Sequence, residues 1–139
     1  MSTDRSALVN GLRDDGHAVV DELSTCTCTC GCGDPMELAA AFVEAALMVA
    51  DRAHSGRAYI RFSGTRGLFL VEVTHLEPGT FDAVMVDEAA MIALDGLRAW
   101  AAEFGRGLTV ERGPRDQFRV TIVFEPVVGD SRHRGASAA

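Results

Sequence analysis

The chain has 139 residues, the length of one domain, and can bury a core without disulfide or metal staples. Its 47% hydrophobic and 24% charged residues are ordinary for a globular protein, and its formal net charge of −7 argues against binding nucleic acid or an anionic membrane. No apolar run is long enough to span a bilayer and the first residues lack a secretory signal, so we expect a cytoplasmic protein.

The N-terminal segment, residues 1–33, has no clear element. Leu8 and Leu12 have helical spacing, but Gly11 weakens that interpretation, and residues 19–23 fit either a short helix or an edge strand. A low-complexity loop follows at residues 24–33. We therefore expect this segment to precede a folded domain over residues 34–128, followed by a flexible tail over residues 129–139.

Two long helices are predicted in the central part of the chain. The first covers about residues 35–54, because Asp34, Pro35 and Glu37 form a helix start and apolar residues then recur on one face. The second covers about residues 84–104, where an apolar stripe ends at a glycine; its members are Ala90, Leu94, Leu97, Ala101 and Phe104.

Four strands are predicted around these helices. Apolar and polar residues alternate over residues 58–63, and residues 68–73 are nearly all apolar, which indicates a hairpin. Residues 76–82 contain Pro78 and Gly79 and are predicted to be loop. Strands at Leu108–Val110 and Phe118–Phe124 follow the second helix. The order predicts an α+β, two-layer sandwich, with two main helices on one face of a mixed, mostly antiparallel sheet.

The end of the predicted domain resembles a known superfamily. Residues 104–114, in which a helix closes on a glycine pair, lead into the strand at residues 118–124. This resembles the GHKL (Bergerat) ATPases, in particular the histidine-kinase branch, over about residues 36–126. The resemblance implies a Bergerat-like fold with positions for ATP and magnesium.

The resemblance also assigns positions, and most of them depart from the family pattern. Glu44 falls at the position of the family's acidic general base, and Met48 replaces the asparagine that coordinates magnesium. A thioether is a poor ligand for that cation. His75 stands where an aspartate would bind adenine, and of that motif's glycines only Gly79 is retained. The family's phosphate-binding glycine loop falls at Ile92–Leu94, where the chain has no glycine pair, and the segment before it, Asp87 and Glu88, is acidic and would repel a triphosphate.

Each position also has a plain structural interpretation. Glu44 is more simply a solvated carboxylate on a polar helix face, and His75 a strand-end residue that bonds a loop. Arg112, Arg115 and Arg119 form a basic group that is either solvated surface or a docking patch.

Four cysteines, Cys26, Cys28, Cys30 and Cys32, recur at every second residue. In an extended chain such neighbours lie about 6.6 Å apart, which suits an ordinary zinc site poorly and favours copper(I), a small thiolate cluster or a site shared between chains. Transient disulfides and a flexible loop without any metal are the alternatives.

Three functions remain open on the sequence. The preferred one is a non-catalytic regulatory or signalling module that keeps the ATPase scaffold and acts on a protein partner, without ATP or magnesium. The second is a thiolate metal-binding or redox sensor that uses zinc or copper at the cysteine loop. The third is a small ATP-binding protein with an altered site. A homo-oligomer is compatible with each of them.

Overall fold

The computed structural model describes residues 5–22, 36–53, 56–65, 68–104 and 107–124. Its elements in chain order are α1 (Arg5–Asp14), β1 (Ala18–Asp21), α2 (Met36–Ala53), β2 (Ala58–Thr65), β3 (Leu68–His75), α3 (Thr80–Val86), α4 (Glu88–Phe104), β4 (Gly107–Arg112) and β5 (Phe118–Phe124). No helix in these ranges is both long and apolar enough to cross a membrane.

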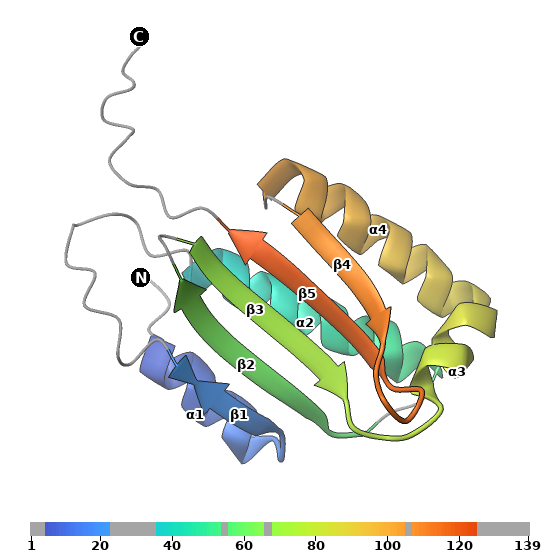
Figure 1. Ribbon diagram of the computed structural model, residues 1–139, viewed down its shortest axis with the longest axis horizontal. Helices are drawn as coiled ribbons and strands as arrows, with labels where there is room; N and C mark the ends of the chain where they lie inside the picture. The colour runs from blue at the N-terminus through green and yellow to red at the C-terminus, as the bar shows by residue number, and fades with distance from the viewer. Residues whose placement is uncertain (1–4, 23–35, 54–55, 66–67, 105–106, 125–139) are drawn as a thin grey trace, which may run out of the picture.

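The strands form one mixed sheet in the order β1-β2-β3-β5-β4 (Figure 1). β1 pairs with β2 in parallel, and every other neighbouring pair is antiparallel. The antiparallel pairs β2–β3 and β4–β5 each join strands that are consecutive in the chain. β3 and β5 are also neighbours in the sheet, although α3, α4 and β4 lie between them in the sequence. The predicted mixed, mostly antiparallel sheet is confirmed.

The helices form the second layer of the sandwich. α2 lies behind the strands in Figure 1, with α4 beside it on the side of β4. β5 shows the strict alternation of a half-covered strand, because Phe118, Val120, Ile122 and Phe124 are buried and the residues between them are not. These side chains meet Phe42 and Leu94 of the helices in one core. The predicted two-layer α+β sandwich is confirmed.

The first predicted helix is confirmed as α2, whereas the second differs from its prediction. The chain is extended at Asp87 (φ −97°, ψ 118°), so α4 begins only at Glu88 and a separate helix, α3, precedes it. α3 begins at Thr80, inside the segment that the sequence predicts to be loop. Gly79 explains the difference, because its left-handed conformation (φ 83°) turns the chain directly into α3.

The ambiguous N-terminal residues form a helix and the parallel edge strand. Val9, Leu12 and Val19 are buried and belong to the same core as the rest of the domain. The amide of Ala58 donates to Nδ1 of His17 (3.0 Å), which ties this region to the start of β2. The domain boundary at residue 33 stays a prediction, since residues 23–35 and 125–139 lie outside the described residues.

Candidate functional site

A partly open groove of about 270 Å³ lies between α2 and α4. Its lining residues are Ala41, Ala45 and Met48 from α2 and Ala93, Gly96, Leu97 and Trp100 from α4. On α2, the neighbouring Phe42, Ala46 and Val49 are fully buried against the core, while Met48 is 48% exposed. The groove therefore opens away from the sheet.

The small residues explain why the two helices form this groove. Ala41 and Ala45 are one turn apart on α2, and Ala93 and Gly96 are neighbours on α4. Small side chains leave a furrow above the contact between helices, where larger ones would fill it. The groove is thus open where the alanines and the glycine lie, and larger side chains stand around it.

Trp100 forms one wall of the groove, and its ring is fixed by aromatic neighbours. The indole packs against Phe104 at 5.4 Å between ring centroids and meets the edge of Phe124 at 6.2 Å. Phe124 belongs to β5, so this wall is anchored to the sheet as well as to α4. The tryptophan is the single one in the sequence.

The chemistry of the groove is almost entirely apolar. No lining side chain carries an oxygen atom, and the only heteroatoms are the sulfur of Met48 and the indole nitrogen of Trp100. Magnesium requires oxygen ligands, and phosphate requires N–H donors or cations. These lining side chains are suited to apolar groups.

An acidic line borders the groove along α2. Glu37, Glu44 and Asp51 are exposed and follow one another at intervals of seven residues, so they lie on one side of the helix about 10 Å apart. Glu44 lies one turn from Met48, as the sequence predicts. Together, α2 and α4 contain six acidic residues and two arginines, which makes this layer the source of most of the net negative charge.

His75 and Gly79 lie apart from the groove lining. His75 ends β3 and is 1% exposed, with its Nε2 3.8 Å from Oδ1 of Asp51. A side chain at Gly56 would contact the imidazole, since a Cβ there would lie 3.4 Å from Cε1. Met48 is half exposed and His75 is enclosed, so the two side chains have different surroundings.

The start of α3 is bound to the hairpin between β4 and β5. The amide of Gly79 donates to the carbonyl of Arg115 (3.1 Å), and the amide of Phe81 donates to the carbonyl of Asp116 (2.9 Å). Thr80 is fully buried; its hydroxyl donates to the carbonyl of Glu77 (3.0 Å) and accepts from the amide of Phe118 (2.9 Å). These contacts make α3 a fixed part of the fold.

The start of α4 is capped by the preceding residue, Asp87. Its Oδ1 accepts a hydrogen bond from the amide of Ala90 (2.9 Å), and its carbonyl oxygen accepts from Met91 (2.9 Å). An aspartate at this position satisfies an orphan amide and favours the positive end of the helix dipole. A carboxylate therefore already occupies the position where an anion would bind.

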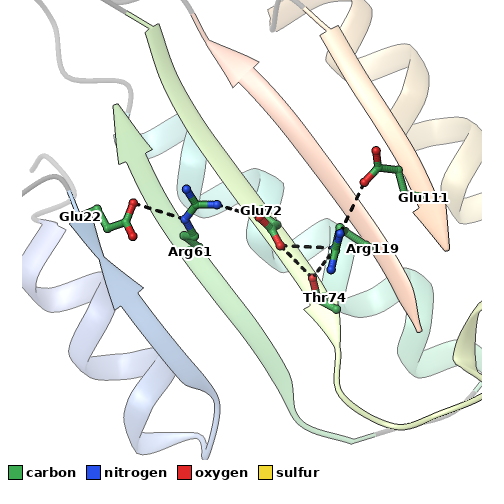
Figure 2. Close-up of polar contacts among 6 residues, drawn as sticks. All are labelled: Glu22, Arg61, Glu72, Thr74, Glu111 and Arg119. Carbon is green, nitrogen blue, oxygen red and sulfur yellow. Dashed lines mark hydrogen bonds and ion pairs between the residues drawn. The ribbon is translucent and has the colours of Figure 1, made fainter. Parts of the chain in front are cut away.

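The opposite face of the sheet carries a ladder of alternating charges (Figure 2). Arg61 contacts Glu22 and Glu72, each at 3.3 Å, and Arg119 contacts Glu72 (3.4 Å) and Glu111 (3.7 Å). Thr74 donates to Glu72 and accepts from Arg119. The ladder begins at Glu22, directly after β1, and crosses the other four strands of the sheet.

Each arginine of the ladder is paired with two carboxylates. Burial by itself would lower the pKa of Arg61, but the charges of Glu22 and Glu72 outweigh it and raise that pKa above its ordinary value. Arg119 lies within the ladder, and Arg112 contacts Asp82 (3.0 Å) and Asp116 (2.8 Å). Two of the three arginines that the sequence grouped are thus paired with carboxylates.

Sequence reasoning missed the alanine and glycine lining and the ladder. Small residues recur beside the apolar stripe of each helix. They line a common groove only because α2 packs against α4 in the folded structure. In the ladder, alternate outward residues of neighbouring strands carry opposite charge, a signal that needs the strand order to be read. The cysteine site, Cys26 to Cys32, lies outside the described residues, within which no group of His, Cys, Asp and Glu could hold a metal.

Comparisons with known proteins found similarity in structure but not in sequence. No family model matches the sequence, and no curated protein matches it. The structure is similar to that of Acinetobacter baumannii histidine kinase AdeS, with a TM-score of 0.50 and 12% sequence identity over 86% of this chain. The chain spans 61% of the length of that structure. At this identity the likeness concerns the fold alone: the chain has a histidine-kinase-like fold.

Proposed function

We propose that this chain is a regulatory or signalling module, built on a degenerate GHKL (Bergerat) ATPase scaffold of the histidine-kinase type, that acts on a protein partner without turning over ATP. The similarity of its fold to a histidine kinase supports the scaffold. The departures at the family's ATP and magnesium positions support the loss of catalysis.

The observation that carries this proposal is the capped start of α4. In the resembled family, a glycine-rich loop at this point presents free amides to the phosphates. Here the carboxylate of Asp87 accepts the amide of Ala90 at 2.9 Å, and a second anion at the same place would be repelled. The amides of Gly79 and Phe81, at the start of α3, are likewise donated to carbonyl oxygens of the hairpin.

The groove supplies an independent argument against the magnesium site. Met48, at the position of the family's asparagine, lines a groove whose side chains offer no oxygen ligand. Glu44 is exposed on the neighbouring side of α2. We therefore expect neither a coordinated magnesium ion nor an activated water at this helix.

Titration with ATP and magnesium tests this proposal against an ATP-binding protein with an altered site. A ligand at one hundred times its dissociation constant adds about 2.7 kcal/mol to the free energy of unfolding, which a thermal melt detects easily. We expect no change in melting temperature. A clear rise that disappears in Glu44→Ala would overturn the proposal and establish the altered ATP site.

A thiolate sensor is the second candidate, because four cysteines alternate along residues 26–32. Elemental analysis of protein purified without chelators tests it. Stoichiometric zinc or copper that is lost in a Cys28→Ser, Cys30→Ser variant would establish this function. Metal content that is the same in both proteins would exclude it for these two thiols.

A further inference from the structure

We propose that the groove between α2 and α4 binds an amphipathic helix of a partner protein, whose apolar side enters the groove and whose Lys or Arg residues face the acidic line on α2. This inference rests on the proposed function, because it names the kind of partner on which the module acts. It is carried by the shape, the exposed apolar residues and the charge of the groove.

The shape suits a helix better than a small ligand. The volume of about 270 Å³ lies below the ~300–1,000 Å³ typical of small-molecule pockets. Along α2, the lining runs from Ala41 to Met48, and along α4 from Ala93 to Trp100, which is about 10 Å in each case. That length matches two turns of a helix, whose residues i, i+3 or i+4, and i+7 would serve as anchors.

Exposed apolar side chains gather around the same groove. Of the five large exposed hydrophobic side chains among the described residues, three lie on α2 or α4: Met48 (48%), Ile92 (66%) and Phe104 (47%). The other two, Val20 and Val86, lie on β1 and α3. Ile92 precedes the lining residue Ala93, and Phe104 contacts the ring of Trp100. An apolar groove with exposed apolar neighbours is typical of a protein-interaction surface.

The charge around the groove selects a basic partner. Glu37, Glu44 and Asp51 form a line about 20 Å long on one side of the groove. On α4, Arg98 is turned about 140° around the helix from Ala93 and so faces away from the lining. A second copy of this chain, packed symmetrically on the groove, would bring two acidic lines together, so charge opposes that occupant.

The open face of the sheet is a poorer docking surface for the same partner. Its arginines and carboxylates already contact one another across the strands (Figure 2). A basic helix would have to replace those contacts, whereas on α2 it would meet exposed carboxylates.

The test uses two designed helical peptides of eighteen residues as probes. Both carry leucine at positions i, i+4, i+7 and i+11; one has lysines on its flanks and the other has glutamates. Emission of Trp100 reports binding, because the single tryptophan lines the groove. Fluorescence anisotropy of the labelled peptides gives the affinities. We expect the lysine peptide to shift the emission and to bind at least tenfold more tightly than the glutamate peptide.

Gly96→Leu is designed to fill the groove. A Cβ at Gly96 would have no neighbour within 4 Å, so a side chain there starts in open space. We expect binding of the lysine peptide to weaken at least tenfold in this variant, while its melting temperature does not fall. Unchanged binding in Gly96→Leu, or no binding to the native chain, would overturn the groove as the docking site.

Charge substitutions test whether the acidic line itself, and not only the net negative charge of the protein, attracts the lysine peptide. We expect Glu44→Lys to weaken binding of the lysine peptide several-fold. The matched control Asp95→Lys, on the far side of α4, should have little effect on that binding. Equal effects of the two substitutions would overturn the proposed role of the acidic line. Self-association that Gly96→Leu abolishes, measured by sedimentation, would instead assign the groove to a second copy.

These outcomes are independent of the test of the proposed function. A rise in melting temperature with ATP and magnesium would refute the proposal of a non-catalytic module, regardless of the results with the peptides. Absence of the expected peptide binding would refute the groove as a docking site and would not affect the proposal of a non-catalytic module.

Discussion

The two faces of this molecule use charge in opposite ways. On the open face of the sheet, Arg61 and Arg119 alternate with carboxylates, and Glu72 is only 13% exposed between them. On the helical face, Glu44 and its neighbours border an apolar groove and point into water. The first arrangement stabilises the sheet, and the second leaves charge and apolar surface available to another molecule. Substitutions on each face should therefore differ in what they change.

Trp100→Ala tests whether the groove also contributes to stability, and we expect the largest effect here. The ring packs on Phe104 and Phe124, so its removal should lower the free energy of unfolding by about 2–4 kcal/mol, since the indole is half buried. Urea denaturation followed by circular dichroism measures it. Trp100→Phe, which keeps an aromatic ring, should lose less. A loss below about 1 kcal/mol in Trp100→Ala would mean that this wall has no structural role.

Glu72→Ala tests the ladder at its centre. Its carboxylate contacts Arg61, Arg119 and Thr74, so removing it leaves two guanidinium groups near each other without the central acceptor. We expect a loss of about 1–2 kcal/mol, because each arginine retains a more exposed partner. Chemical denaturation gives the value. Glu72→Gln, which keeps hydrogen-bonding atoms but removes the charge, should recover part of it, and full recovery in this variant would argue that charge is unimportant.

Gly96→Ala tests the groove in the stabilising direction. Glycine inside a helix is about 1 kcal/mol less favourable than alanine, and a Cβ at this position meets open space. We expect the free energy of unfolding to rise by about 0.5–1 kcal/mol, measured by thermal melting. Gly79→Ala is the matched contrast and should destabilise, because Gly79 has a φ of 83°. A loss of stability in Gly96→Ala would mean that α2 and α4 approach more closely than this structure has them.

Glu44→Ala should have the smallest effect on stability. The side chain is exposed, and surface substitutions of this kind usually change the free energy of unfolding by less than about 0.5 kcal/mol. Comparison with Glu72→Ala under the same conditions sharpens the contrast between the faces. A loss as large as that of Glu72→Ala would contradict the view that the acidic line is reserved for binding.

The sequence alone was sufficient for the long regular elements. The periodicity of residues 35–54 and the alternation at Phe118–Phe124 predict α2 and β5, because one face of each must be buried. It was insufficient for α3, since its seven residues follow Pro78 and Gly79 and are held by contacts with β5 that no local pattern reveals. The parallel pairing of β1 was hidden for the same reason, since its partner β2 lies about forty residues away.

For the site, the sequence determined which side chains are present, and the tertiary structure decided which of them share a surface. The sequence shows that Met48 offers no oxygen ligand and that Asp87 brings a carboxylate to the start of a helix. That Met48 shares a groove with Trp100, while His75 is enclosed under the end of α2, depends on how the helices pack on the sheet. Packing is set by contacts between distant segments, and these are absent from any local stretch of sequence.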